Sequence, residues 1–459
     1  MNHDDLRDWS KRAADWAHDY HTGLRGRPVR APLVPGKIAA QLPAVPPEQP
    51  EPMEQVFADF EAILPGITHW QHPRFFAYFP ANASPASMLA EQLANAIAAQ
   101  GMIWQTSPAV TEVEQVMMTW LRQGFGLADH FTGTIHDSAT TATLSAVLTM
   151  REAALTWKGL SQGLSGAPRM RLYCSAQTHS SVDKAARVAG IGQDNLVKIA
   201  TDDHLAMRPD ALQAAIQADR DQGYLPIGVI LCCGGTSVGA FDTLTECIAI
   251  AHAADLPTHV DAAWAGSAMI CPEFRELWAG IDGADSIVIN PHKWLGAQFD
   301  CAVQFLRDPT PQVRTLGLRP SYLETAGKED IVNFNEWTVP LGRRFRALKL
   351  WFTLRAYGLD GLRQRIRNHV KWSCEAAEEI AKIPGIVLTT NPRLSLFTFA
   401  CATDDATETL LNKINDDGRI YLTQTRHEGK YVIRMQVGQF DCTREDVMMA
   451  PKVIAELME

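Results

Sequence analysis

The chain has 459 residues, of which 46% are hydrophobic and 20% are charged, and its formal net charge is −10 at pH 7. This length exceeds what one compact core usually holds, so we expect a large domain with at least one smaller unit. The acidic balance argues against nucleic-acid binding, which needs clustered Lys and Arg side chains. No run of about 18 apolar residues free of charge is present, so we expect no membrane span.

The N-terminal region predicts a dimerisation segment over residues 1–85. Residues 1–24 have the pattern of an amphipathic helix and lack the apolar core of a signal peptide. The tract from Pro28 to Pro52 holds eight prolines and is expected to wrap in extended form over another surface. The nine cysteines are scattered and include no CxxC pair, which is typical of a reduced, cytoplasmic protein.

Residues 86–360 alternate between helical and strand-like runs and predict a large ligand-binding domain. The helical runs include SMLAEQLANAIAAQ and ATLSAVLTMREAALTW, and the short apolar runs include RLYCSA, PIGVILCC, THVDAAW and DSIVIN. This alternation is typical of an α/β fold, with a mostly parallel sheet and helices on both faces. Ligands of such sheets bind beyond the carboxyl ends of the strands.

Residues 361–459 predict a small α+β domain. GIVLTTNPRLSLFTFAC is expected to form two strands, and ATETLLNKINDDG a helix that ends at Gly418. RIYLTQTRHEGKYVIRMQVG is expected to form a hairpin that turns at Glu428 and Gly429. A last helix begins after Thr443, with acidic residues in its first turn.

Polar side chains stand at the ends of four predicted strands. Lys293 follows the apolar strand SIVIN and precedes Trp and Leu, so desolvation is expected to lower its pKa and make the amine a nucleophile. His179 lies just past another strand, and Thr236 lies in a glycine-rich turn. Asp261 lies in an apolar strand, where a carboxylate needs a partner.

This set of residues indicates pyridoxal phosphate. That cofactor needs a lysine for an imine, an acid for its pyridine nitrogen, an aromatic face and a phosphate cradle. The cradle is expected where Ser138, Ala139 and Thr140 open a helix. Asp137 would repel a phosphate, so we expect its side chain to point away.

Each feature also has a structural interpretation when it is taken alone. HDSATTAT is more often an ordinary helix cap. An isolated buried Asp261 is often salt-bridged, and an isolated His179 is often structural. The NPHKW string is more specific, and the occurrence of Asp261 and Lys293 on neighbouring strand ends favours the joint interpretation.

The sequence resembles the group II pyridoxal-phosphate decarboxylases, and within them the aromatic-L-amino-acid decarboxylases and aromatic aldehyde synthases. The similar segments are HPRFFAYFPANASPASMLAEQLANAI, SPAVTEVEQVMMTWL, THSSVDKAARVAG, HVDAAWAGSAMICPEFR, NPHKWLGAQFDC and VPLGRRFRALKLWFTLRAYG. The resemblance implies PLP fold type I and an intertwined homodimer with active sites at the subunit interface. It also implies decarboxylation of an aromatic L-amino acid to the amine and CO2.

Residue roles follow from the resemblance by position. Lys293 would form the imine, and Asp261 would pair with the pyridinium nitrogen. The other implied cofactor contacts are His179 and Ala263 on the two ring faces, Thr236 near the ring edge, His292, and Ser138, Ala139, Thr140 and Asn290 at the phosphate. The implied substrate pocket consists of Trp70, Tyr78, Phe79, Pro80 and, from the partner subunit, Met102. Ala81 and Trp264 replace the threonine and tyrosine of animal enzymes, so the particular aromatic substrate stays open.

One difference from the family concerns the product. Family decarboxylases carry a tyrosine on a mobile loop before PLGRR, and counting back from Trp337 places this position at Phe334, which we include among the catalytic positions. After CO2 leaves, Cα needs a proton from a positioned acid, and phenylalanine has none to give. Slow protonation would let O2 react and give an aromatic acetaldehyde, ammonia and hydrogen peroxide. Alternatively, His179, Tyr322 or a water donates the proton and the amine remains the product.

Other protein classes stay open with less support. An aminotransferase of the same fold needs an arginine for the substrate carboxylate, and the sequence alone does not locate one. A cysteine desulfurase needs a reactive loop cysteine, and none of the nine is in an obvious loop of that kind. The intact set of Lys293, Asp261 and His179 disfavours a non-catalytic protein. We expect no metal, nucleic acid or membrane partner.

Overall fold

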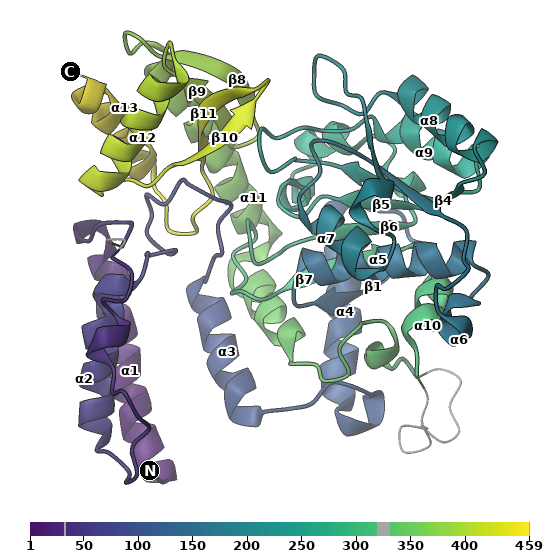
Figure 1. Ribbon diagram of the computed structural model, residues 1–459. Helices are drawn as coiled ribbons and strands as arrows, with labels where there is room; N and C mark the ends of the chain where they lie inside the picture. The colour runs from purple at the N-terminus through teal and green to yellow at the C-terminus, as the bar shows by residue number, and fades with distance from the viewer. Residues whose placement is uncertain (32–33, 319–330, 459) are drawn as a thin grey trace. The chain divides into compact units, whose positions relative to one another are not determined.

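The computed structural model describes residues 1–31, 34–318 and 331–458. The chain divides into two compact units, whose helices and strands are labelled in Figure 1. The larger unit consists of residues 81–371 and 393–396. The smaller unit consists of residues 1–80, 372–392 and 397–459, so the two ends of the chain belong to the same unit.

The larger unit is built around a seven-stranded sheet in the order β1-β7-β6-β5-β4-β2-β3. Strands β3, β2, β4, β5 and β6 are parallel, whereas β7 is antiparallel to β6 and β1. Every residue of β5 and β6 is buried, so both faces of the sheet are covered. The predicted mostly parallel α/β sheet is confirmed. The strands are β1 (Thr132–His136), β2 (Met170–Ser175), β3 (Leu196–Ile199), β4 (Leu225–Cys232), β5 (Thr258–Asp261), β6 (Ser286–Ile289) and β7 (Ala302–Leu306).

Helix α5 packs across the middle of this sheet, against β4, β5, β6 and β7, and α7 lies beside it (Figure 1). Helices α8 and α9 contact each other and β4. Val147 and Met150 of α5 share a buried cluster with Leu172 and Ile230 of the sheet. The helices are α3 (Pro85–Ile97), α4 (Pro108–Phe125), α5 (Ala139–Ala154), α6 (Gly159–Gln162), α7 (Ser181–Val188), α8 (Pro209–Asp221), α9 (Leu244–Ala253), α10 (Thr310–Leu316) and α11 (Arg346–Ala381), which is kinked at Gly358 and continues into the smaller unit.

The C-terminal part of the smaller unit has the predicted α+β structure. Its four-stranded sheet has the order β10-β11-β9-β8, with α12 and α13 packed together beside it. Helix α12 ends at Gly418 in the left-handed conformation, at φ 81°. Glu428 and Gly429 turn the hairpin with φ values of 50° and 79°, as a tight hairpin turn requires. The elements are β8 (Val387–Arg393), β9 (Leu396–Ala400), α12 (Asp404–Asp417), β10 (Thr423–His427), β11 (Lys430–Gln436) and α13 (Arg444–Met458).

The N-terminal part of the same unit contains α1 (His3–Gly23) and α2 (Met53–Ile63). The two helices contact each other through aromatic rings, with the centroids of Trp16 and Phe60 at 4.9 Å, but α1 has no buried residue. Arg25 and Arg74 both pair with the buried carboxylate of Asp446, at 2.7 and 3.1 Å. These ion pairs join the N-terminal segment to α13.

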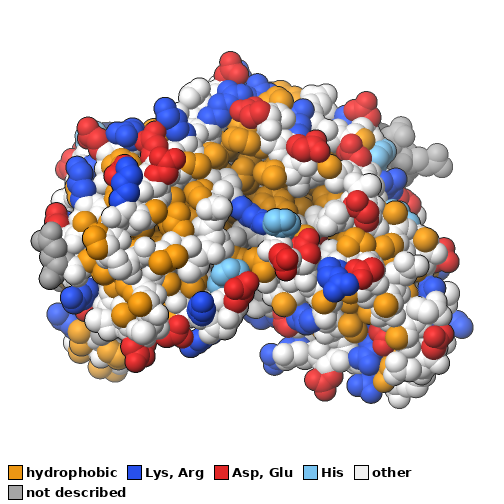
Figure 2. Space-filling view, turned by 90° about the horizontal axis from the view of Figure 1, so that it is seen from above, with side chains coloured by type: hydrophobic (Ala, Val, Ile, Leu, Met, Phe, Trp, Pro, Cys, Tyr) orange, Lys and Arg blue, Asp and Glu red, His pale blue; other side chains and the backbone are white. Residues whose placement is uncertain are grey.

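The surface carries charges of both signs. On the face shown in Figure 2, the basic and acidic side chains of the described residues are interspersed. None of the helices in the described part of the chain has the length and hydropathy that crossing a membrane requires.

Candidate active site

The predicted site residues of the larger unit come from the carboxyl ends of neighbouring strands. Asp261 is the last residue of β5 and lies opposite Val288 of β6 and Cys232 of β4. Strand β6 ends at Ile289 and is followed directly by Asn290. The parallel register therefore brings these strand ends to one edge of the sheet, as the sequence predicted.

Backbone hydrogen bonds fix the segment that carries Lys293. The Lys293 amide donates to the Asn290 carbonyl at 2.9 Å, and the Asn290 amide donates to the Ala263 carbonyl at 2.8 Å. The side-chain amide of Asn82 donates to the Lys293 carbonyl at 2.6 Å, and the Asn82 backbone amide donates to the His292 carbonyl at 2.9 Å. Asn82 therefore holds the lysine backbone from a distant part of the chain, a contact that sequence reasoning missed.

Asp261 provides a buried carboxylate at this edge. Its side chain is 7% exposed, and one carboxylate oxygen accepts the Ala263 amide at 3.0 Å. A single neutral donor does not offset the cost of burying a charge. A protonated ring nitrogen would supply the missing positive partner, so this residue fits pyridoxal phosphate.

His179 lies within electrostatic range of both Asp261 and Lys293. Desolvation lowers its pKa, Asp261 raises it and Lys293 lowers it, with a net decrease. The Ser181 amide donates to His179 Nδ1 at 3.1 Å, so the proton of the neutral imidazole is assigned to Nε2. A neutral, solvent-exposed imidazole can lie against a flat ring without adding a second positive charge.

The N-terminus of α5 is the expected anion site. Ser138 caps the helix by accepting the Thr141 amide at 3.2 Å, and the first-turn amides of Ala139 and Thr140 have no intrahelical acceptor. Asn290 is 4% exposed, and its side-chain amide has two N–H donors that could bind a phosphate. These groups fit a phosphate.

Asp137 is compensated by arginine. Its carboxylate borders a cavity of about 140 Å³ together with Arg343 and Arg346, and it lies within electrostatic range of Arg346. The Arg346 guanidinium also pairs with Asp300 at 3.0 Å. The acidic residue that seemed unfavourable beside a phosphate therefore belongs to a network of opposite charges, which the sequence did not reveal.

The remaining predicted cofactor residues occupy nearby turns. Thr236 is half-buried in the turn after β4, and Ala263 is 9% exposed in the turn after β5. His292 is 4% exposed, and its Nδ1 accepts the Cys301 amide at 3.0 Å. Burial lowers the pKa of His292 to about 3, so this side chain is neutral at pH 7.

Four of the five predicted substrate residues lie in the smaller unit, and Met102 lies half-buried in the larger unit. Trp70 and Tyr78 are 40% and 45% exposed and stack at 5.8 Å, whereas Phe79 is buried. Pro80 is the last residue of this segment within the unit. Tyr421, which sequence reasoning missed, packs edge-on against Tyr78 at 6.2 Å.

Phe334 precedes Asn335, whose amide donates to the Met102 carbonyl at 3.0 Å. The Phe334 ring is 1% exposed and packs with Leu306, Trp337 and Val332. Leu306 ends β7 and pairs with the first residues of β1 and β6, so it lies at the edge of the sheet opposite Asp261. Within this chain the Phe334 ring therefore packs in a core at that edge. Its catalytic position stays a prediction, because the expected active site is shared between two subunits. Tyr322, the alternative donor, lies outside the described residues.

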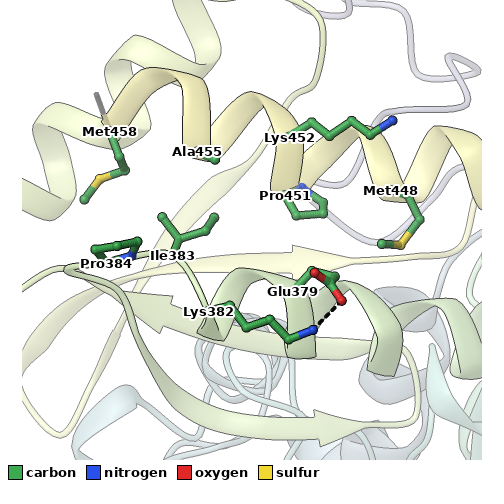
Figure 3. A pocket seen from close by; sticks show the side chains of 9 residues that line it. All are labelled: Glu379, Lys382, Ile383, Pro384, Met448, Pro451, Lys452, Ala455 and Met458. Atoms are coloured by element: carbon green, nitrogen blue, oxygen red, sulfur yellow. Dashed lines mark hydrogen bonds and ion pairs between the residues drawn. The ribbon is translucent and has the colours of Figure 1, made fainter.

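A second pocket, within the smaller unit, shows none of this chemistry. It has a volume of about 570 Å³ and lies between α13 and the segment that follows α11 (Figure 3). Its only acid, Glu379, pairs with Lys382 at 2.6 Å. The lining side chains are Glu379, Lys382, Ile383, Pro384, Met448, Pro451, Lys452, Ala455 and Met458.

Comparison with known proteins gives the family of this chain. Residues 35–402 match the pyridoxal-dependent decarboxylase conserved domain. The chain is 39% identical to aromatic-L-amino-acid decarboxylase of Sus scrofa, with 97% of this chain and 93% of that protein covered. It is 34% identical to phenylacetaldehyde synthase of Arabidopsis thaliana, with coverage of 99% and 96%. The structure of Oryza sativa TDC with PLP and tryptamine superposes with a TM-score of 0.96 at 32% identity, covering 100% of this chain and 98% of that one.

The fold and the strand-end site define a pyridoxal-phosphate enzyme of fold type I. The chain belongs to the pyridoxal-dependent decarboxylase family.

Proposed function

We propose that the enzyme decarboxylates an aromatic L-amino acid to the corresponding amine and CO2, with pyridoxal phosphate attached to Lys293. The observation that carries this proposal is the convergence of Lys293, Asp261 and His179 at one edge of the sheet. The relatives named above support the aromatic substrate class.

The cofactor would be held at three places. Lys293 binds its aldehyde carbon, Asp261 holds the proton on the pyridine nitrogen, and the N-terminus of α5 with Asn290 binds the phosphate. His179 and Ala263 enclose the two ring faces. When bound, pyridoxal phosphate supplies an electron sink for the pair left on Cα after CO2 departs.

The aromatic residues of the smaller unit support a flat substrate side chain. Trp70 and Tyr78 present a stacked pair that is partly exposed, and such rings favour offset or edge contacts with another ring. Phe79 and Pro80 add apolar surface, as Met102 of a partner subunit would. An apolar surrounding also favours loss of a carboxylate, because its departure removes a poorly solvated charge.

The product is proposed to be the amine rather than the aldehyde. The aromatic acetaldehyde remains the alternative product, because Phe334 has no hydroxyl that could protonate Cα. With the amine as product, His179, Tyr322 or a water would protonate Cα in place of the missing tyrosine.

A homodimer and a cytoplasmic location complete the proposal. Leu89, Leu93 and Ile97 form a stripe along α3 and are 51%, 43% and 61% exposed, which favours burial against a second copy. All nine cysteines are free, as in a reducing compartment. Sedimentation of the holoenzyme checks the dimer, and a monomer at micromolar concentration would exclude it.

Attachment of the cofactor and release of CO2 test the proposed chemistry together. Wild-type enzyme is expected to release CO2 from at least one of L-phenylalanine, L-tyrosine, L-dihydroxyphenylalanine and L-tryptophan, and borohydride is expected to fix the cofactor to Lys293. Lys293→Ala should lose the fixed cofactor and more than ~10³-fold of the activity. Borohydride labelling of another lysine would overturn the assignment.

A further inference from the structure

Two buried tryptophans adjoin the residues proposed to hold the cofactor. Trp264 follows Ala263, three positions after Asp261, and Trp294 follows Lys293 directly. Both side chains are 1% exposed. Their ring centroids are 5.2 Å apart and their planes are inclined by 21°, so the indoles stack and connect the turn after β5 to the turn after β6.

Helix α11 also fixes this stack, through His369. The Trp294 indole N–H donates to His369 Nδ1 at 2.9 Å, and the two rings are nearly parallel at 4°. His369 is fully buried, and burial lowers its pKa to about 3. It is therefore neutral at pH 7, with Nδ1 able to accept the indole proton, so the orientation of Trp294 is set by a hydrogen bond as well as by packing.

The turn after β4 packs on the same indole. A Cβ added at Gly234 would lie 3.2 Å from Trp264 Cε3 and 2.3 Å from the Cβ of Ala265, so this turn passes Trp264 as closely as glycine allows. Gly234 lies two residues before Thr236. Trp264 is thus in contact with the turns after β4 and β6, and it belongs to the turn after β5.

We propose that Trp264, fixed by Trp294 and His369, is a positioning residue that sets the distance and orientation between Asp261 and Lys293. This inference rests on the proposed roles of those two residues as the groups that hold opposite ends of the cofactor ring system. A flat, rigid cofactor bound at both ends tolerates little error in their separation, since a misplacement of about 1 Å can cost ~10²-fold in rate. The stack of Trp264 on Trp294 restricts the separation of Asp261 and Lys293 without touching the reacting atoms.

The test compares Trp264→Leu with Trp278→Leu, a matched control. Trp278 is also 1% exposed in the larger unit, but it packs edge-on against Phe241 at 5.4 Å. Apoenzyme of each variant is titrated with pyridoxal phosphate, and the dissociation constant is read from the visible absorbance of the bound cofactor. The pH at which this absorbance changes is measured as well, because it depends on how the imine and the ring nitrogen are placed relative to each other.

We expect Trp264→Leu to weaken cofactor binding by about tenfold or more and to shift the pH of the absorbance change. Trp264→Tyr, which keeps a flat ring, should recover most of the affinity. His369→Leu should resemble Trp264→Leu in a milder form, whereas His369→Gln keeps an acceptor and should stay near wild type. Trp278→Leu should lower thermal stability with cofactor affinity within about twofold of wild type.

Equal cofactor affinity and equal pH behaviour in Trp264→Leu and Trp278→Leu would overturn the proposal and leave Trp264 a structural core residue. If Trp264→Leu does not fold, His369→Leu is compared with His369→Gln instead. Equal cofactor affinity and equal pH behaviour in these two variants would also overturn the proposal. Failure of the underlying function looks different. In that case borohydride would not fix the cofactor to Lys293 in the wild-type enzyme, whatever the tryptophan variants do.

Discussion

The guanidinium carbon of Arg343 lies 4.9 Å from the centre of the Phe334 ring, inside the larger unit. Arg343 also donates to Glu114 at 2.7 Å, and both side chains are almost fully buried. Phe334 is therefore one wall of a buried charged network. This placement gives Phe334 a packing role within one subunit, and the catalytic role that the loop sequence suggests stays a prediction.

Phe334→Tyr is expected to destabilise the enzyme without changing its product. The added hydroxyl would enter a core packed around Leu306 and Trp337, and a buried hydroxyl without a partner costs about 1–3 kcal/mol. Denaturant unfolding measures the loss, and product analysis in air measures the amine-to-aldehyde ratio. A parent enzyme that makes aldehyde and a variant that makes amine would show that this ring does face the reaction.

Asp261→Asn tests the buried carboxylate. The amide keeps the shape of the side chain but cannot hold a positive ring nitrogen as firmly, so kcat is expected to fall ~10²- to 10³-fold. Asp242→Asn is the matched control, because Asp242 is also buried but accepts the backbone amides of Cys232 and Met207. Equal kcat values for the two variants would remove Asp261 from the cofactor site.

Asn82→Ala tests the contact that holds the lysine backbone. Loss of the 2.6 Å hydrogen bond to the Lys293 carbonyl is expected to lower kcat/KM about tenfold, because the backbone that carries the catalytic amine is then held less firmly. Asn95→Ala serves as the control, because Asn95 accepts from Arg344 at an exposed position. An Asn82→Ala enzyme with the wild-type kcat/KM would show that the other backbone bonds suffice.

His369 predicts an acid-sensitive stability. In the unfolded chain its imidazole gains a proton as the pH falls through about 6.5, whereas the folded protein keeps it neutral down to about 3. The unfolded state therefore binds more protons between these values, and stability decreases as the pH falls through this window. Relative to His369→Gln, the wild-type free energy of unfolding should fall more steeply, by up to ~1.4 kcal/mol per pH unit. Unfolding at pH 5, 6 and 7 with saturating pyridoxal phosphate measures this, and parallel slopes would contradict it.

Features set by local sequence were predicted well. Short runs of apolar residues predicted the strands that end near Asp261 and Lys293. Turn residues such as Gly418 and Gly429 predicted where the C-terminal elements end. These signals act over a few residues, because they depend on strand periodicity and on backbone conformations that glycine favours.

Features set by distant contacts were not accessible from the sequence. The hydrogen bond from Asn82 to Lys293 spans 211 positions, and no local pattern indicates it. The packing of Phe334 against Leu306 and Arg343 was not predicted, because only the tertiary structure brings these residues together. The arginine that balances Asp137 was likewise hidden, since Arg346 begins a helix far along the chain.

The most direct test of the proposed chemistry follows CO2, amine, aldehyde and hydrogen peroxide together for the wild-type enzyme, with each aromatic L-amino acid in air. We expect the wild type to release CO2 and amine in equal amounts without peroxide. Aldehyde and peroxide in step with CO2 from the wild type would contradict the amine assignment, and no CO2 from any aromatic amino acid would contradict the substrate class.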